Sequence, residues 1–360
     1  MKALISAVLC FLRLSACNLA YALQLVADPY PDKPRITFKP DGTFKITVFS
    51  DMHWGENPWD VWGPQQDANS TRLMKTVLPS EKPDFVVLNG DLITGENAFK
   101  DNATFLIDRI VAPLNAARIP FSSTQGNHDN QKNITHLQEI LREQTVAPLS
   151  YTRVAPAGVG GEEGPGNYWV PVYEKTTDST PTLILWFFDS RGGFTYGDNS
   201  TATAAMNAAW GPAENRGALA FVHIPPHLIQ NLQATLNSTK EPGLNADALG
   251  SGSTQSTTDE ADVGQDDAFW NSLNANVKNL HAVISGHDHG NEWCIREPTK
   301  NVIFCFDKHA GYGGYGDASW GYGVRNLLFS SADPTVGVQT WIRLEEGEVR
   351  ANITLGAQYS

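Results

Sequence analysis

Histidine and carboxylate side chains gather in five short motifs that lie far apart along this chain of 360 residues. The motifs are Asp51-Met52-His53, Gly90-Asp91, Gly126-Asn127-His128-Asp129, Phe221-Val222-His223 and Gly286-His287-Asp288-His289. Five of the nine histidines fall within these 16 positions, which random scatter would rarely arrange. Imidazole nitrogens and carboxylate oxygens bind divalent transition metals, and a pair of such ions can activate water against a phosphate ester. The motifs therefore predict a two-metal site for phosphoester hydrolysis.

Each motif taken alone has a simpler explanation. An isolated Asp-x-His or Gly-Asp usually belongs to a turn or caps a helix. His223 alone would fit a buried, hydrogen-bonded histidine, and His227 could supply the imidazole instead, although we favour His223. His136 and His281 are expected to be surface or structural residues. The ordered set of five motifs, rather than any single one, favours metal binding.

The motifs follow or end apolar runs of strand length. Strands are predicted at residues 43–50, 84–88, 119–124, 218–222 and 282–285, and helices at 71–78, 102–117 and 134–144. This alternation is typical of a sheet covered by helices, in which ligands bind at the carboxyl ends of the strands. Two more strands, at 168–173 and 182–188, predict a second sheet. All five motifs should therefore meet at one edge.

Two glycine-rich segments lie outside the five motifs. Residues 243–267, rich in Gly, Ser, Thr and acidic residues, predict a mobile surface insertion. Residues 311–316 match a dinucleotide-binding pattern, but no helix signal follows, so we reject a nucleotide-cofactor loop. The segment could form a flexible wall of a substrate cleft, with His309 and Tyr312 as contacts, or a plain loop of aromatic residues and glycine.

The N-terminal sequence and the net charge indicate where the protein is located and which partners it can bind. Residues 1–22 predict a secretory signal peptide, with a bacterial lipoprotein site at Cys17 as the alternative. Arg13 interrupts the apolar run, and a membrane span needs about 20 continuous apolar residues, so none is expected. Residues 23–360 are expected to form a single domain. Because the formal net charge is −13, nucleic acid is not expected as a partner.

Two cysteines would stay in the mature chain after removal of the signal. Cys294 and Cys305 flank a strand, a polar turn and a second strand, so they can face each other across a hairpin and form a disulfide. Two buried free thiols are the alternative. Six N-glycosylation sequons support a secreted glycoprotein. They begin at Asn69, Asn102, Asn133, Asn199, Asn237 and Asn352.

The order of the motifs resembles that of the calcineurin-like metallophosphoesterases, over residues 44–329. Residues 305–325 are similar to a fungal and plant branch related to purple acid phosphatases. The resemblance implies an α/β fold, a four-layer α/β/β/α sandwich of two mixed sheets flanked by helices. True purple acid phosphatases have a tyrosinate ligand three residues after the bridging aspartate, where this chain has Thr94. The iron-tyrosinate colour is therefore not expected.

The resemblance also implies a set of metal ligands. One metal would be held by Asp51, His53 and His289, the other by Asn127, His223 and His287, and Asp91 would bridge both. A hydroxide shared by the two ions would attack phosphorus. His128 would protonate the leaving group, and Asp129 would orient the His128 ring. The metals could be Fe, Mn, Zn or a mixed pair, since oxygen and nitrogen ligands suit them all.

These expectations favour a secreted phosphatase acting on monoesters, either small phosphorylated molecules or a phosphoprotein. A phosphodiesterase or nucleotidase would use the same metal core, although the roughly 70 residues after His289 leave little room for a separate nucleotide-binding domain. A non-catalytic binding protein would predict at least one missing ligand. None is missing from the sequence.

Overall fold

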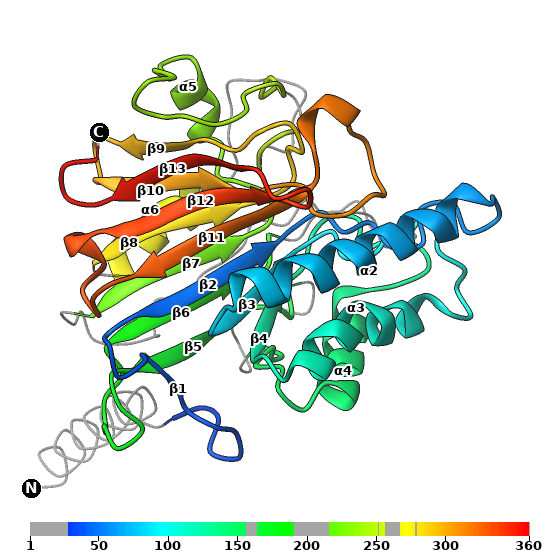
Figure 1. Cartoon of the computed structure of the whole chain (residues 1–360), viewed down its shortest axis with the longest axis horizontal. Coiled ribbons are helices and arrows are strands. Elements are labelled where there is room, and N and C mark those ends of the chain that lie inside the picture. The colour runs from blue at the N-terminus through cyan, green and yellow to red at the C-terminus, as the bar shows by residue number, and fades with distance from the viewer. Residues whose placement is uncertain are drawn as a thin grey trace, which may run out of the picture.

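A computed structural model describes residues 28–155, 164–190, 216–250, 252–255, 267–277 and 279–359 (Figure 1). The predicted signal peptide, the sequon at Asn199 and residues 256–266 of the predicted insertion lie outside the described residues. Among the helices that are described, none has both the length and the apolar character needed to cross a membrane.

Two mixed β-sheets form the centre of the fold. The first has seven strands in the order β1-β5-β6-β7-β8-β10-β9, and the second has six in the order β13-β12-β11-β2-β3-β4. The strands of the first sheet are β1 (Ile36–Thr37), β5 (Tyr168–Tyr173), β6 (Leu183–Phe188), β7 (Gly217–Val222), β8 (Leu280–Ser285), β9 (Cys294–Glu297) and β10 (Val302–Phe306). The strands of the second sheet are β2 (Phe44–Phe49), β3 (Phe85–Asn89), β4 (Phe121–Thr124), β11 (Gly323–Phe329), β12 (Val338–Leu344) and β13 (Val349–Leu355). Each sheet contains parallel and antiparallel pairs.

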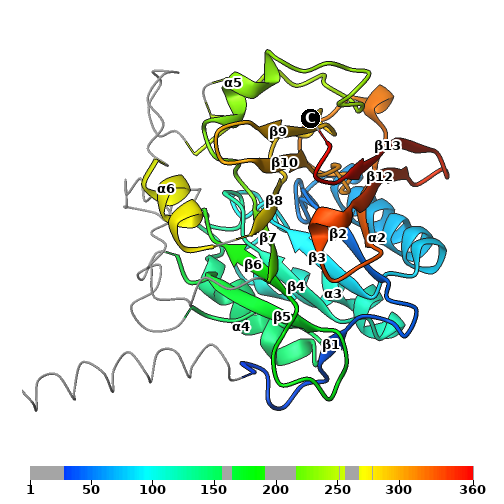
Figure 2. The same ribbon diagram turned by 90° about the vertical axis from the view of Figure 1, so that its left-hand side faces the viewer.

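Helices cover the outer faces of both sheets. They are α2 (Trp62–Glu81), α3 (Ala103–Ala117), α4 (His136–Val146), α5 (Ile229–Gln233) and α6 (Asp267–Asn276). Figure 2 shows α6 on one side of the two sheets and α2 on the other. Three large groups of buried apolar side chains fill the spaces between the four layers. This arrangement confirms the predicted α/β/β/α sandwich.

The alternation of side chains in the strands accounts for these layers. In β3, Phe85 and Val87 pack between the two sheets, whereas Val86 and Leu88 pack against the helices. Successive side chains of a strand point to opposite faces, so a strand that is buried on both faces is apolar throughout. The run Phe-Val-Val-Leu of β3 is of this kind.

Most predicted elements are present, with small shifts at their ends, and helix α2 differs more. Strands β1, β12 and β13 and helices α5 and α6 were not among the predicted elements. Helix α2 begins nine residues before the predicted start at Thr71. Pro64 does not prevent this, because the first turn of a helix needs no backbone donor there. Strand β11 was not predicted, and it lies in the middle of its sheet, between β12 and β2.

The predicted disulfide is confirmed. Strands β9 and β10 pair antiparallel, with Cys294 directly opposite Cys305, and an S–S bond of 2.05 Å joins the two residues. Both cysteines are buried between the two sheets. The hairpin therefore brings the cysteines together, and the alternative of two free thiols is excluded.

Candidate metal centre

The five motifs meet at one edge of the two sheets. Strands β2, β3, β4, β7 and β8 end within a few residues of the five motifs. Two groups of side chains could each hold a metal ion, because their ligand atoms lie within 4.8 Å of one another. One group is Asp51, His53 and His289, and the other is Asp91, His223 and His287. The structure thus contains two candidate metal sites.

Asp91 lies between the two groups. Its Oδ2 atom is 3.0 Å from Nε2 of His223, in the second group, and 3.7 Å from Nε2 of His53, in the first. In the first group, Nε2 of His289 is 3.4 Å from Oδ1 of Asp51 and 3.3 Å from Nε2 of His53. Asp91 therefore has the position that a carboxylate shared by two ions requires.

Asn127 has the position of an additional ligand. Its side-chain oxygen is buried and has no hydrogen-bond partner among the described residues. Burial of an unpaired polar atom costs free energy, so such an atom points to a partner that binds there. The next residue, His128, donates its backbone N–H to Oδ1 of Asp91 at 2.8 Å, which places Asn127 beside the second group. An oxygen ligand with nitrogen and carboxylate neighbours fits a divalent metal.

Each histidine of the two groups uses one ring nitrogen to contact a protein oxygen. Three of them contact a backbone carbonyl, which can only accept a hydrogen bond, so the ring nitrogen must donate. The partners are the carbonyl of Asn89 for Nδ1 of His223, Gly252 for Nε2 of His287 and Tyr315 for Nδ1 of His289. In the neutral form of each ring, the other nitrogen is then left with a lone pair. This is the arrangement typical of metal-binding histidines.

Charge also favours metal binding. Burial opposes ionisation of Asp51 and Asp91, but neighbouring histidines outweigh it and hold the pKa of both carboxyls below the usual range. Burial lowers the pKa of His53 to about 3 and also lowers the pKa of His287. For His223, burial would lower the pKa, but Asp91 and then Asp51 raise it to about 10. Metal binding would therefore release a proton from His223.

Four of the seven predicted ligands have a left-handed backbone. The φ angles are 55° for Asp51, 47° for His53, 49° for Asp91 and 76° for His287. This conformation costs about 1–2 kcal/mol for a residue other than glycine. The chain adopts it directly after the strand ends, where a sharp turn aims each side chain into the shared site. Strain of this kind is concentrated at functional sites.

Glycines allow the ligand loops to approach one another closely. A Cβ atom on Gly126 would lie 2.2 Å from Oδ1 of Asp91, and one on Gly90 would lie 2.5 Å from the ring of His223. Such distances are too short for any side chain. The glycines of the Gly-Asp and Gly-Asn-His-Asp motifs are therefore required by packing within the site.

The aromatic and glycine segment 311–316 packs on the first group of ligands. The Tyr315 ring stacks on His289 with 4.0 Å between centroids, and the His309 ring lies 4.0 Å from the same ring. Tyr312, one of the two predicted contacts, instead hydrogen-bonds Arg72 and Glu345. The segment therefore supports metal ligands, and its key aromatic residue is Tyr315.

We expect Gly314→Ala to weaken metal binding. Gly314 has a φ of 70°, and an added Cβ would lie 2.6 Å from Cδ2 of His53 and 2.9 Å from Cε1 of His289. Because both rings are fixed by hydrogen bonds, the substitution should displace them and reduce zinc affinity about 10-fold or more, as loss of ligand support does. Zinc titration of the purified protein measures the effect.

Two further alanine variants separate the effect of backbone strain from that of contact with the ligand rings. Gly42→Ala places a side chain at a φ of 83° far from the ligands, so it tests backbone strain alone. In Gly250→Ala the added Cβ would meet no atom within 4 Å, so this variant shows the effect of a glycine-to-alanine change without backbone strain or a close contact. Unchanged zinc affinity in Gly314→Ala, or an equal loss in Gly42→Ala, would contradict the expected role of the segment.

The predicted proton donor lies next to both groups, but its carboxylate partner differs from the prediction. The ring of His128 is 4.9 Å from the ring of His53, and its Nδ1 lies 2.6 Å from Oε1 of Glu96. Asp129 was predicted to orient this ring. Its carboxylate instead accepts the backbone N–H groups of Ile93 and Gly126. Asp129 therefore joins two ligand loops, and Glu96 contacts the His128 imidazole.

The other histidines lie outside the two groups. His227 Nδ1 is 3.0 Å from Oγ1 of Thr254, so the structure brings His223, and not His227, to the ligands. His136 is buried, and its two ring nitrogens contact Asp189 and the carbonyl of Gly126. His136 thus has the structural role that was one of its two predicted roles.

The described part of residues 243–267 contains exposed residues, such as Asn245 and Ala246, and it also contacts the ligand loops. Gly252 accepts a hydrogen bond from His287 at 2.7 Å, and the N–H of Ala246 donates to Gly290 at 2.9 Å. The hydroxyl of Tyr315 also donates to Asp247. These bonds connect residues 243–250 and 252–255 to the ligand loops. This part of the segment is a wall of the metal centre.

Comparison with known proteins agrees with this geometry. Residues 44–291, more than half of the chain, match the family model described as calcineurin-like phosphoesterase. The chain belongs to this family. Its predicted resemblance to the family is therefore confirmed, and the five motifs of the phosphoesterase all lie within the matched region.

Relatives of the phosphoesterase come from plants and fungi. The protein named "Probable inactive purple acid phosphatase 28" of Arabidopsis thaliana is 28% identical, with 88% of this chain and 84% of that protein aligned. "Phosphatase DCR2" of Saccharomyces cerevisiae is 27% identical, with 73% of this chain and 47% of that protein aligned. A dimetal phosphatase of known structure from Danio rerio superposes with a TM-score of 0.52 at 13% identity, covering 89% of this chain and all of that one. The last similarity shows the shared fold.

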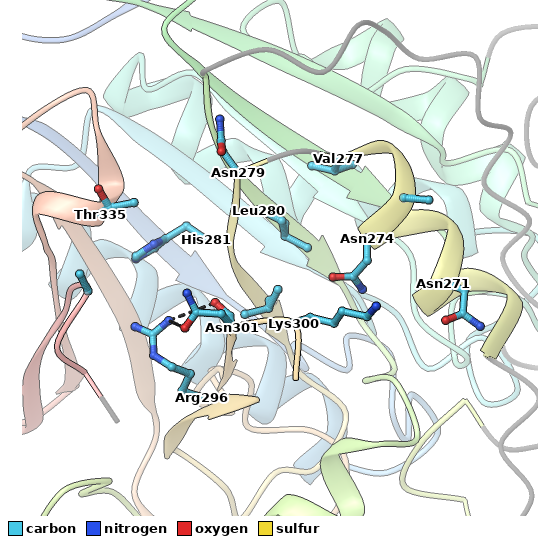
Figure 3. A pocket seen from close by; sticks show the side chains of 13 residues that line it. Asn271, Asn274, Val277, Asn279, Leu280, His281, Arg296, Lys300, Asn301 and Thr335 are labelled. Carbon is cyan, nitrogen blue, oxygen red and sulfur yellow. Dashed lines mark hydrogen bonds between the residues drawn. The ribbon is translucent and has the colours of Figure 1, made fainter. Parts of the chain in front are cut away.

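A cavity of about 470 Å³ lies at the other end of the phosphoesterase, away from the ligands (Figure 3). Its lining includes His281 at the start of β8, Arg296 in β9, Val302 at the start of β10 and residues of α6. Nε2 of His281 contacts the carbonyl of Leu355 at 3.0 Å, and Arg296 donates to the carbonyls of Tyr359 and Asn301. No buried side-chain atom among its described lining residues lacks a partner. Nothing in this cavity thus indicates a ligand, and His281 is structural.

Proposed function

We propose that this protein is a phosphatase that uses two metal ions to hydrolyse phosphate monoesters. The observation that carries the proposal is the presence of two ligand groups, with Asp91 of the second group facing His53 of the first, next to a histidine that can give up a proton. The substrate would be a small phosphorylated molecule or a phosphoprotein. An acidic protein can bind such anions, because bound divalent ions dominate the local charge.

The residues present fit a pair of divalent ions. Asp51, His53 and His289 would hold one ion, Asn127, His223 and His287 the other, and Asp91 would contact both. When bound, the two ions would make water sufficiently acidic to supply a nucleophile near neutral pH and would neutralise charge on the phosphate oxygens. Mixed nitrogen and oxygen ligands suit Fe, Mn and Zn.

His128 would protonate the leaving oxygen of the substrate. Burial would lower the pKa of its imidazole, but Glu96 and then Asp91 outweigh burial and raise the pKa to about 9. The ring therefore carries a proton at neutral pH in the metal-free protein, and the contact with Glu96 favours the same state when metals are bound. Because Nδ1 faces Glu96, Nε2 is the nitrogen that can donate to the leaving group. Such a donor matters most for an alkyl ester, whose leaving alkoxide is strongly basic.

We expect Glu96→Gln to shift the pH dependence of turnover. Glu96 raises the pKa of His128, so its loss should lower that pKa. A donor works only below its pKa, and the alkaline limb of the kcat profile should therefore move to lower pH, with the rate well below this limb changing less than about 10-fold. The profile on an alkyl phosphate measures the shift. A limb that stays in place, or moves to higher pH, would show that Glu96 does not act on the donor.

The rates on a nitrophenyl phosphate monoester and on the corresponding diester test the proposed reaction. A phosphatase should hydrolyse the monoester faster, whereas a phosphodiesterase, which would share the metal core, should prefer the diester. Elemental analysis of the same sample should find two metal ions per chain. Two ions with no hydrolysis of either ester would refute the enzyme and favour a binding protein.

The names of the relatives point in both directions, since one is called inactive and another a phosphatase. The side-chain oxygen of Asn127 supports metal binding here. A protein that binds no metal would have no use for a buried, unpaired oxygen at the end of a strand. The full ligand set has the same implication, because a scaffold without catalysis would be free to lose members of it.

We also propose that the protein follows the secretory route. The disulfide between Cys294 and Cys305 supports this proposal, because such bonds persist in oxidising compartments. The sequons at Asn102, Asn237 and Asn352 are exposed, as glycosylation requires. Expression in eukaryotic cells should place the full chain in the medium, in a form that a glycosidase shortens. A variant without residues 2–22 should stay in the cells.

A further inference from the structure

The fourth histidine of the two ligand groups is held differently from the other three. His223, His287 and His289 use backbone carbonyls, but Nδ1 of His53 lies 3.1 Å from the side-chain hydroxyl of Thr94. A carbonyl is present whatever the side chain is, whereas a hydroxyl depends on the residue. His53 is therefore the one of these four whose support can be removed by a single substitution.

Glu56 decides the direction of this hydrogen bond. The Thr94 hydroxyl donates its only proton to Oε2 of Glu56 at 2.6 Å. It can then only accept from His53, so Nδ1 must carry the proton of the ring. The lone pair is left on Nε2, the atom that faces Asp91 and His289.

The surrounding chain keeps this arrangement fixed. Thr94 is 1% exposed, and its backbone N–H donates to the carbonyl of Trp54 at 2.9 Å. The neighbouring N–H of Gly55 donates to Oδ1 of Asp67 at 3.1 Å. The loop that carries Glu56 is thus tied to the loop that carries Thr94 and to helix α2. Neither partner of His53 can easily turn away.

We propose that Glu56 and Thr94 are positioning residues that fix the tautomer of His53 and so set the metal affinity of the group Asp51, His53 and His289. The proposal rests on the metal centre of the proposed function. A hydrogen-bond partner behind a metal-binding histidine orients the ring and makes it a stronger ligand, and its loss typically costs about 10- to 100-fold in affinity. The effect should fall on one metal site and spare the other.

Zinc titration of the metal-free protein tests the proposal. Thr94→Val keeps the shape of the side chain and removes the hydroxyl, so one of two binding steps should weaken about 10- to 100-fold, while the other changes little. Thr94→Ser keeps the hydroxyl and should restore the step to within about threefold. His53→Ala identifies the step, because it removes the ligand itself. Thr76→Val, at an exposed position of α2, is the matched control.

Glu56→Gln keeps the test decisive if Thr94→Val does not fold. Glu56 is partly exposed, so its amide variant should fold, and loss of the negative charge should weaken the same binding step. Unchanged zinc affinities in Thr94→Val and Glu56→Gln would overturn the proposal. A serine variant as weak as the valine variant would do so too, since it would show that the hydroxyl has no part.

These outcomes are separate from those of the proposed function. A protein that binds two zinc ions, loses one step in Thr94→Val and hydrolyses no ester would refute the phosphatase and support the positioning residues. A wild-type protein that binds neither zinc, manganese nor iron would overturn both proposals.

Discussion

Asp91→Asn should abolish both metal binding and phosphatase activity. The Asp91 carboxylate faces both ligand groups, at 3.0 Å from His223 and 3.7 Å from His53. An amide has the same shape but no charge, so two ions would lose their shared anion. Loss of about 4 kcal/mol of Lewis-acid stabilisation alone corresponds to a fall of roughly 1000-fold in kcat/KM. Elemental analysis and monoester hydrolysis measure the two effects.

The matched control for this variant is Asp60→Asn. Asp60 is exposed and has no contact with the ligand groups, so its variant should keep two metal ions and full activity. Thermal unfolding of the metal-free proteins checks that Asp91→Asn still folds. A folded Asp91→Asn protein that keeps both metals and its turnover would remove the basis of the dinuclear assignment.

The parts of this fold that could be predicted from sequence are those with a local pattern. Strand β3 is apolar at every position before Asn89, and its assignment needed no other part of the chain. Strand β11 has the same central place but was missed. Arg325 and Asn326 interrupt its apolar run, and their burial depends on distant partners, such as the carbonyl of Phe306 and the hydroxyl of Thr47. Those partners are visible only in the folded chain.

In the candidate site, too, the residues that could be predicted are those with a local sequence pattern. The resemblance implied seven ligands, and the structure brings six of them into the two groups, because their motifs lie next to strand ends that meet at one edge. The residues behind them have no such pattern. Gly252 reaches His287 from 35 positions away, and Tyr315 reaches His289 from 26. Glu96 was missed because Asp129, adjacent to His128 in sequence, seemed the natural partner. Adjacent side chains need not face each other, and Glu96 makes the contact.

His128→Ala should keep both metal ions and lose most turnover on an alkyl phosphate. His128 lies beside the two groups without belonging to either, and its ring is paired with Glu96. Removal of a general acid typically lowers kcat about 10²- to 10⁴-fold. The loss should be much smaller on a nitrophenyl phosphate, whose leaving group is stable without a proton. The ratio of the two losses therefore reports the proton donor directly.

His281→Ala is the control for this comparison. His281 contacts the carbonyl of Leu355 in the cavity away from the ligands, so its loss should leave both substrates and both metals nearly unchanged. An equal loss on the two esters in His128→Ala would assign the residue to substrate or metal binding instead of proton transfer. Zinc titration separates these two cases, because only a role in metal binding would lower the affinity. A proton donor is thus distinguished from a metal-binding or substrate-binding residue, because only its loss lowers turnover more on the alkyl phosphate than on the nitrophenyl phosphate.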